Sequence, residues 1–396
     1  MQLTELNYQK KKLPENLNKI GLILLILGAV LGIVAFFVDG TRASFNYLLS
    51  YTFLISIAVG ALFLVALEYV TNADWSVPFR RIVEIFAGLI PFLAILVIPL
   101  LFSMHDIYHW THTEVVAQDE ILQEKEPYLN IPFFITRVFV ILGIWYIFYF
   151  ILSRNSLKQD SSGDQKLTTI NIRLSAVFIP LFAVTISITA FDWLMSVDPH
   201  WFSTIFGVYY FSGTVIAILA AVTIAAVYFK ENGYLHERIT QDHLYSLGAL
   251  MFVFVNFWAY IAFSQYMLIW YADLPEETLW FLQKWEGSWA FFSLFLLLIH
   301  FVVPYILLLS QPAKMDPLRL KIAAVVLLFA HFFDLYWMVM PEMPGLEKGY
   351  IFSWIDFVFP VAAIGFVMIV FNMKAKKENL IPVGDPKLKR GLDFHL

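Results

Sequence analysis

The sequence contains no cysteine and few charged residues. Without thiols the chain cannot carry an iron–sulfur cluster, a thioether-attached haem, a thiolate metal site or a disulfide. Charged residues make up 14% of the chain and hydrophobic residues 60%, whereas a soluble domain has roughly 25% charged residues. This composition is typical of an integral membrane protein.

Ten apolar segments are each about as long as the roughly 20 residues that a helix needs to cross a membrane. Their apolar residues do not alternate with polar ones, which indicates helices and not the strands of a barrel. We therefore predict an all-α integral membrane protein with ten transmembrane helices. They are Ile20–Val38, Tyr47–Val70, Ile82–Met104, Ile131–Leu152, Ile170–Met195, Phe202–Phe229, Leu247–Trp270, Ser288–Leu309, Leu320–Met340 and Ile351–Phe371.

The basic residues are distributed unevenly between the two sides of these helices. Most of the 26 lysines and arginines lie before the first helix, in every second loop or after the last helix. Such a bias marks the cytoplasmic side of a membrane protein. We predict a cytoplasmic N-terminal tail (1–19), a ten-helix membrane domain (20–372) and a cytoplasmic C-terminal tail (373–396).

Short motifs recur four helices apart. Phe191–Met195 places an acid and a tryptophan at the end of the fifth helix, and Phe333–Met338 does the same in the ninth. The last residues of the third helix also resemble those of the seventh, and the last residues of the fourth resemble those of the eighth. We predict a duplication, with repeat 1 at about 47–195 and repeat 2 at about 202–340. Helices two to five and six to nine would form two four-helix bundles, with helices one and ten flanking them. The alternative is that these residue types are simply common at helix ends.

Ionisable side chains inside membrane helices are costly and mark candidate sites. His331 and Asp334 lie three residues apart on one face of the ninth helix, so that they can share a single proton. His300 lies near the centre of the eighth helix, and we expect Asp356 and Arg137 as neighbours of Asp334. The functional interpretation is a proton path or a quinone-facing cluster. The alternative is a set of structural pairs that hold the helices together.

His300 and His331 also raise the question of a b-type haem, whose iron takes axial imidazoles. Bulky residues flank both histidines and leave little space for a macrocycle. We expect neither haem nor a metal ion on this chain, and no catalytic residue is assigned.

Two longer stretches carry a resemblance to a known family. They are Phe191–Tyr209, and Phe263–Tyr271 with the following Leu274–Thr278. In them the chain resembles the ActF family, the second large membrane subunits of bacterial alternative complex III, within the wider NrfD-like family of polysulfide-reductase membrane subunits. The resemblance covers most of the chain. It implies ten helices in two four-helix bundles, located in the bacterial inner membrane.

The resemblance also implies a function and partners. It implies a subunit of a respiratory quinol:cytochrome c oxidoreductase with no redox centre of its own, acting as a scaffold with a role in proton transfer. Haem c and iron–sulfur clusters would belong to partner chains, a multihaem cytochrome c and an iron–sulfur protein. A sister NrfD-like subunit, small membrane subunits and a terminal oxidase are further candidate partners, and no nucleic acid is expected. Menaquinol or ubiquinol would be the electron donor, but no full quinol-site motif is present to assign a ligand.

Four residues where the fifth helix leaves the membrane are candidates for subunit docking. They are Asp192, Asp198, His200 and Trp201. The loops on this side are rich in acids, which suits a basic partner. We predict that these residues hold the extrinsic subunits and do not take part in the chemistry.

A stand-alone proton-coupled secondary transporter is the competing hypothesis. Transporters often have helix breaks at corresponding places in both halves. Here Pro91 and Pro180 interrupt the third and fifth helices, whereas the seventh and ninth have no internal proline. This asymmetry favours the oxidoreductase subunit.

Overall fold

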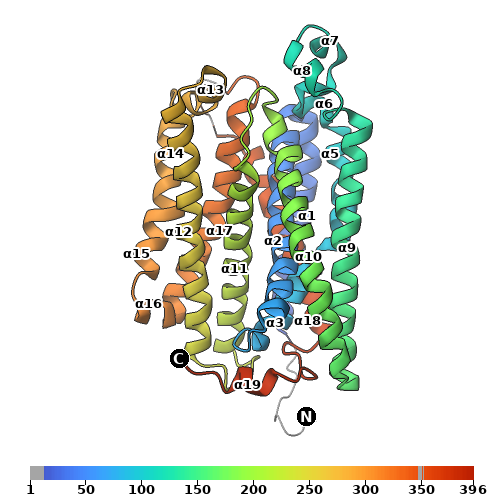
Figure 1. Ribbon diagram of the computed structural model, residues 1–396, viewed down its shortest axis with the longest axis vertical. Coiled ribbons are helices and arrows are strands. Elements are labelled where there is room, and N and C mark those ends of the chain that lie inside the picture. Colours follow the sequence, from blue (N-terminus) through green and yellow to red (C-terminus); the bar gives the residue numbers. More distant parts are fainter. Residues whose placement is uncertain (1–12, 347–349, 351) are drawn as a thin grey trace.

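Figure 1 shows the computed structural model, which describes residues 13–346, 350 and 352–396. Within these ranges the chain forms helices and no strand. Ten stretches of the described chain are long and apolar enough to cross a membrane, which confirms the predicted fold class. They comprise α1 (Glu15–Val38), α2 (Gly40–Thr71), α3 to α5 (Val77–Ala87, Ile90–Leu96, Ile98–Phe102), α9 (Ile131–Ser162), α10 (Gln165–Trp193), α11 (Phe206–Glu231), α12 (Gln241–Ala272), α14 with η3 and α15 (Trp289–Leu297, Leu298–Val302, Val303–Leu308), α17 (Pro317–Val339) and α18 (Ile355–Lys377).

Shorter helices connect these spans at the two ends of the molecule. They are α6 (Met104–Ile107), η1 (His109–Thr111), α7 (Thr113–Val116), α8 (Glu120–Lys125), η2 (Met195–Val197), α13 (Pro275–Gln283), α16 (Gln311–Met315), η4 (Met340–Glu342) and α19 (Leu388–Leu392). We call the end with α7, α8 and α13 the loop end, and the end with α19 the tail end (Figure 1).

Prolines divide the third span into the three short helices α3, α4 and α5. Pro91 and Pro99 lie in the first turns of α4 and α5. Proline has no backbone N–H and clashes with the preceding turn, so a helix restarts where it occurs. The third span also begins earlier than predicted, at Val77 and not at Ile82, because its first turns are buried despite their charged residues. The predicted start of the tenth helix, Ile351, lies outside the described residues.

The spans form the two predicted four-helix bundles. The first consists of α2, α3 to α5, α9 and α10, and the second of α11, α12, α14 with α15, and α17. Between the bundles, α2 packs against α11 and α17, and α10 packs against α11. Accordingly α2 and α11 are the most deeply buried of the ten spans in the described chain.

The first and last spans lie side by side, although they come from opposite ends of the chain. α1 packs along α18, and both contact α2. A Cβ atom on Gly365 would lie 2.5 Å from the backbone nitrogen of Leu25, so no larger residue is compatible with this helix contact. The flanking helices of the prediction are therefore a packed pair.

A buried ion pair fastens the segment after α18 to the first bundle, within which further buried ion pairs join the helices. Arg80 on α3 contacts Asp385 of this segment as well as Glu68 on α2, and Arg81 contacts Asp160 on α9. α18 itself continues to Lys377, and α19 packs against α3. The predicted C-terminal tail (373–396) is thus folded onto the tail end.

Candidate functional site

Two histidines and one aspartate lie together inside the second bundle. His300, His331 and Asp334 each offer a nitrogen or oxygen atom within 4.8 Å of the others. Their exposed fractions are 0%, 1% and 1%. The structure therefore brings together three of the side chains that the sequence predicted as a cluster, and we call them the His–Asp cluster.

An irregular turn presents His300 to this cluster. The turn, η3, is π-helical, and it is followed by Pro304 in the first turn of α15. A π-helical turn widens the helix locally and is frequent at functional sites. The ring of His300 stacks on that of Trp258 from α12, with ring centroids 3.8 Å apart and an interplanar angle of 18°.

Asp334 is held by two neutral donors. The Tyr209 hydroxyl donates to Oδ1 at 2.5 Å, and the Trp258 indole N–H donates to Oδ2 at 3.0 Å. The described residues supply no ion-pair partner for this carboxylate. Hydrogen bonds from a hydroxyl and an indole stabilise a carboxylate without fixing a counter-charge beside it.

His331 connects the cluster to the first bundle. Its Nε2 lies 2.9 Å from Ser56 Oγ on α2, and Ser56 lies 3.2 Å from the Tyr210 hydroxyl on α11. On the other side of the ring, a Cβ on Gly213 would lie 2.5 Å from Nδ1. The imidazole thus occupies space that only a glycine on α11 leaves open.

Three ring nitrogens of the cluster have no hydrogen-bond partner within the described part of the chain. They are Nδ1 and Nε2 of His300 and Nδ1 of His331. A buried polar atom without a partner costs about 1–3 kcal/mol, so such atoms are rare and call for an explanation. Gaps of up to 4.8 Å can be crossed by a proton through one bridging water or a small side-chain rotation. The cluster therefore has the elements of a proton-exchange site.

The side chains of the His–Asp cluster are also of the types that bind metal ions. Two imidazoles and one carboxylate are side chains that transition metals accept. Here both oxygens of Asp334 already accept hydrogen bonds from Tyr209 and Trp258. The expectation of no metal ion on this chain stays a prediction.

Asp356 and Arg137, expected beside Asp334, bind other partners. Arg42 donates to Asp356 from Nε at 2.9 Å and from Nη2 at 2.7 Å, which ties α2 to α18. Arg137 donates to Asp192 from Nε at 2.7 Å and from Nη2 at 3.1 Å, which ties α9 to α10. The structure does not bring these two side chains into the His–Asp cluster, because each completes a buried ion pair of its own.

The four residues predicted to dock partner subunits differ in their accessibility. Asp192 is 1% exposed and Trp201 is 3% exposed. The Trp201 indole donates to the Glu277 carbonyl at 3.1 Å and stacks on Trp280. These two residues stabilise the loop end from inside. Of the other two, His200 is exposed and Asp198 is partly exposed.

His200 joins two loops at the loop end. Its Nε2 lies 2.6 Å from Asp119 Oδ2, and half of its side chain is exposed. The hydrogen bond from His200, helped by the backbone N–H of Leu122, lowers the pKa of Asp119 below its ordinary value. The contact places a hydrogen-bonded histidine–carboxylate pair at the surface, where a partner protein can reach it.

A buried lysine lies below this surface. Lys284 is 0% exposed, its ammonium lies 3.6 Å from the ring centroid of Trp280, and its Nζ lies 3.4 Å from a Glu342 oxygen. Burial lowers the pKa of Lys284 from 10.5 to about 8, while the attraction of Glu342 opposes this change. Lys284 thus connects the end of α13 to η4, which follows α17.

Several residues around the cluster were not among the candidates from the sequence. Tyr209 and Trp258 hold Asp334, Ser56 holds His331, and Gly213 makes room for it. The position of Trp258 in the sequence could have marked it as a candidate. Membrane tryptophans concentrate at the two interfaces, and this one lies near the middle of its span.

No protein-family model matches the chain, and no curated protein sequence is significantly similar to it.

Proposed function

We propose that this chain is a membrane subunit of a respiratory quinol:cytochrome c oxidoreductase of the alternative complex III type, in which His331 and Asp334 pass protons. One observation carries the proposal. Two imidazoles and one carboxylate lie within 4.8 Å of one another and are buried in membrane-spanning helices. Such groups are costly in a membrane, and they commonly belong to proton paths.

The chemistry of the cluster supports proton transfer. A relay needs groups that accept and release a proton and that find hydrogen bonds in both states. Asp334 has two neutral donors, and His331 has one bonded nitrogen and one free nitrogen. A proton that moves from the acid to an imidazole creates an ion pair in place of two neutral groups, so the charge stays local.

The other two candidate aspartates differ from Asp334 in their partners. Asp356 and Asp192 each lie against an arginine, which keeps a carboxylate charged and fixed. Asp334 has no such partner among the described residues. Of the three aspartates named as candidates inside the spans, it is the one suited to a change of protonation.

The assignment to an oxidoreductase rests on the motif resemblance and on the composition. A chain without cysteine needs partner chains for iron–sulfur clusters and thioether-attached haem. Asp198 and His200 at the exposed loop end suit the docking of such partners. With most basic residues at the tail end, we place this end in the cytoplasm of a bacterial inner membrane.

The test combines purification with turnover. The tagged chain is extracted from native membranes in mild detergent, co-purifying chains are identified by mass spectrometry, and quinol oxidation and proton release are measured. We expect cytochrome and iron–sulfur chains to co-purify. We expect Asp334→Asn to preserve assembly but lower turnover or proton release about tenfold or more, whereas Glu286→Gln, at an exposed loop position, changes neither.

Two results would contradict the proposal. Purification of the chain without redox partners would favour the stand-alone transporter. Unchanged turnover and proton release in assembled Asp334→Asn would make the cluster a structural one.

A further inference from the structure

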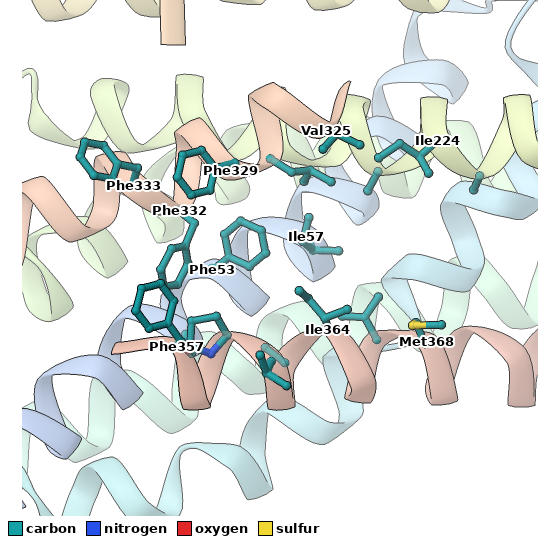
Figure 2. Close-up of a pocket in the computed structure, with 18 of the residues that line it drawn as sticks. Phe53, Ile57, Ile224, Val325, Phe329, Phe332, Phe333, Phe357, Ile364 and Met368 are labelled. Atoms are coloured by element: carbon teal, nitrogen blue, oxygen red, sulfur yellow. The ribbon is translucent and has the colours of Figure 1, made fainter. Parts of the chain in front are cut away.

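A large apolar cavity lies beside the second bundle, outside the His–Asp cluster. Its volume is about 990 Å³, and residues of α2, α11, α17 and α18 contribute to its walls. Figure 2 shows Phe53 and Ile57 from α2, Phe329 and Phe332 from α17 and Phe357 from α18 around the same space. Almost all of its lining is carbon, so water has few partners there.

The cavity opens sideways toward the bilayer. Several residues that line it are also strongly exposed on the apolar surface, among them Val325 (57%), Phe329 (52%), Phe357 (58%) and Ile364 (52%). Exposed apolar residues on a membrane span face lipid. A molecule from the bilayer can therefore enter between α17 and α18 without crossing water.

The dimensions of the cavity favour an occupant with two hydrocarbon chains. Lining residues run along α18 from Asp356 to Asn372, a helical rise of about 24 Å. The volume of about 990 Å³ then corresponds to a mean cross-section of roughly 41 Å². An extended hydrocarbon chain with neighbours at about 4.5 Å takes up roughly 20 Å². A single chain would leave much of this space without van der Waals contacts, whereas two chains side by side fill it better.

Two unpartnered hydroxyl groups indicate where the polar part of this occupant lies. Ser50 on α2 and Tyr336 on α17 both line the cavity, and both are 4% exposed. Neither hydroxyl oxygen has a hydrogen-bond partner among the residues that the structure describes. Both groups lie nearer the loop end of their helices, and both can donate to a carbonyl oxygen.

We propose that the cavity binds one diacyl glycerolipid from the bilayer leaflet at the loop end. Its ester carbonyls accept hydrogen bonds from Ser50 and Tyr336, and its two acyl chains run between α17 and α18 toward the tail end. The lipid also shields the His–Asp cluster, because Phe53 lines the cavity while its ring centroid lies 5.8 Å from that of His331. This proposal does not depend on the proposed function.

Lipid retention by the full-length protein tests this site. The protein is exchanged extensively in detergent, and bound lipids are counted and identified by native mass spectrometry. We expect one diacyl lipid to remain on each wild-type chain. Ala225 lines the cavity, so Ala225→Phe fills part of it and should reduce retention at least fivefold. The matched control Ala29→Phe adds the same side chain at an exposed position on α1 and should retain the lipid.

The hydroxyl groups provide a second test that does not depend on the folding of a cavity-filling variant. The double variant Ser50→Ala with Tyr336→Phe should lose the lipid at lower detergent concentrations than wild type. The proposal is wrong if the wild-type protein retains no lipid or retains a single-chained isoprenoid lipid instead. It is also wrong if both tests leave retention as in the wild type.

Discussion

Nε2 of His331 on α17 lies 2.9 Å from Ser56 Oγ on α2, so a hydrogen bond from the His–Asp cluster crosses the contact between the two bundles. The same histidine shares its helix face with Asp334. A change in the protonation of the cluster can therefore alter the contact between bundles, and a shift of α2 can alter the cluster.

Replacement of the glycine behind His331 should disturb the cluster. In Gly213→Ala the added methyl group would lie 2.5 Å from Nδ1, far inside van der Waals contact. The imidazole must move and strain its bond to Ser56, and we expect a loss of about 1–3 kcal/mol in stability, as for other overpacked cores. Thermal unfolding in detergent measures this loss.

Gly143→Ala is the matched control for this substitution. Gly143 lies inside α9, and a Cβ there would meet nothing within 4 Å. Because alanine favours helix more than glycine, this variant should be as stable as wild type or more stable, by up to about 1 kcal/mol. Equal losses in both variants would show that the His331 contact is not the cause.

The Arg137–Asp192 pair should behave as a buried structural ion pair. Arg137→Met leaves the Asp192 carboxylate buried without a cation, at a cost of about 3–5 kcal/mol. The double variant Arg137→Met with Asp192→Leu removes both charges and should recover much of this loss. Unfolding of both variants by heat gives the comparison, and a double variant no more stable than the single one would argue against the ion pair.

Lys284 should make stability depend on pH in alkaline solution. Its pKa is about 8 in the folded protein against 10.5 ordinarily, so the unfolded chain binds more protons between these values. Stability should therefore rise with pH in this window, by on the order of 3 kcal/mol in total. Well below pH 8 the lysine is protonated in both states and contributes no slope.

Two variants isolate the lysine in that measurement. Lys284→Gln removes the titrating group and should flatten the rise in unfolding temperature between pH 8 and 10.5. Lys166→Gln, at an exposed position, should leave the rise intact. A rise that persists in Lys284→Gln would assign it to another group.

The exposed pair at the loop end should affect assembly more than chemistry. Asp198→Asn and His200→Ala alter partly exposed side chains near Asp119. We expect both variants to co-purify less of the extrinsic chains and to keep normal turnover per assembled complex. Full assembly with lost turnover would give these residues a chemical role.

Hydropathy alone was sufficient to predict the ten spans, because the membrane requires each helix to satisfy its own backbone. The two bundles were predicted from the motifs that recur four helices apart. Helical spacing also placed His331 beside Asp334. The partners of these residues could not be predicted in this way. Tyr209, Trp258 and Ser56 come from three other helices, and Asp356 pairs with Arg42 from a helix that is distant in sequence. Such contacts depend on how the helices are rotated and packed, which a hydropathy pattern does not contain.

The central claim is that Asp334 gains and loses a proton during turnover. Infrared difference spectroscopy of the assembled complex, with and without quinol, detects the carbonyl band of a protonated carboxylic acid directly. We predict a band that changes on reduction of the wild-type complex and is missing from assembled Asp334→Asn. Identical difference spectra in the wild type and in Asp334→Asn would contradict the claim.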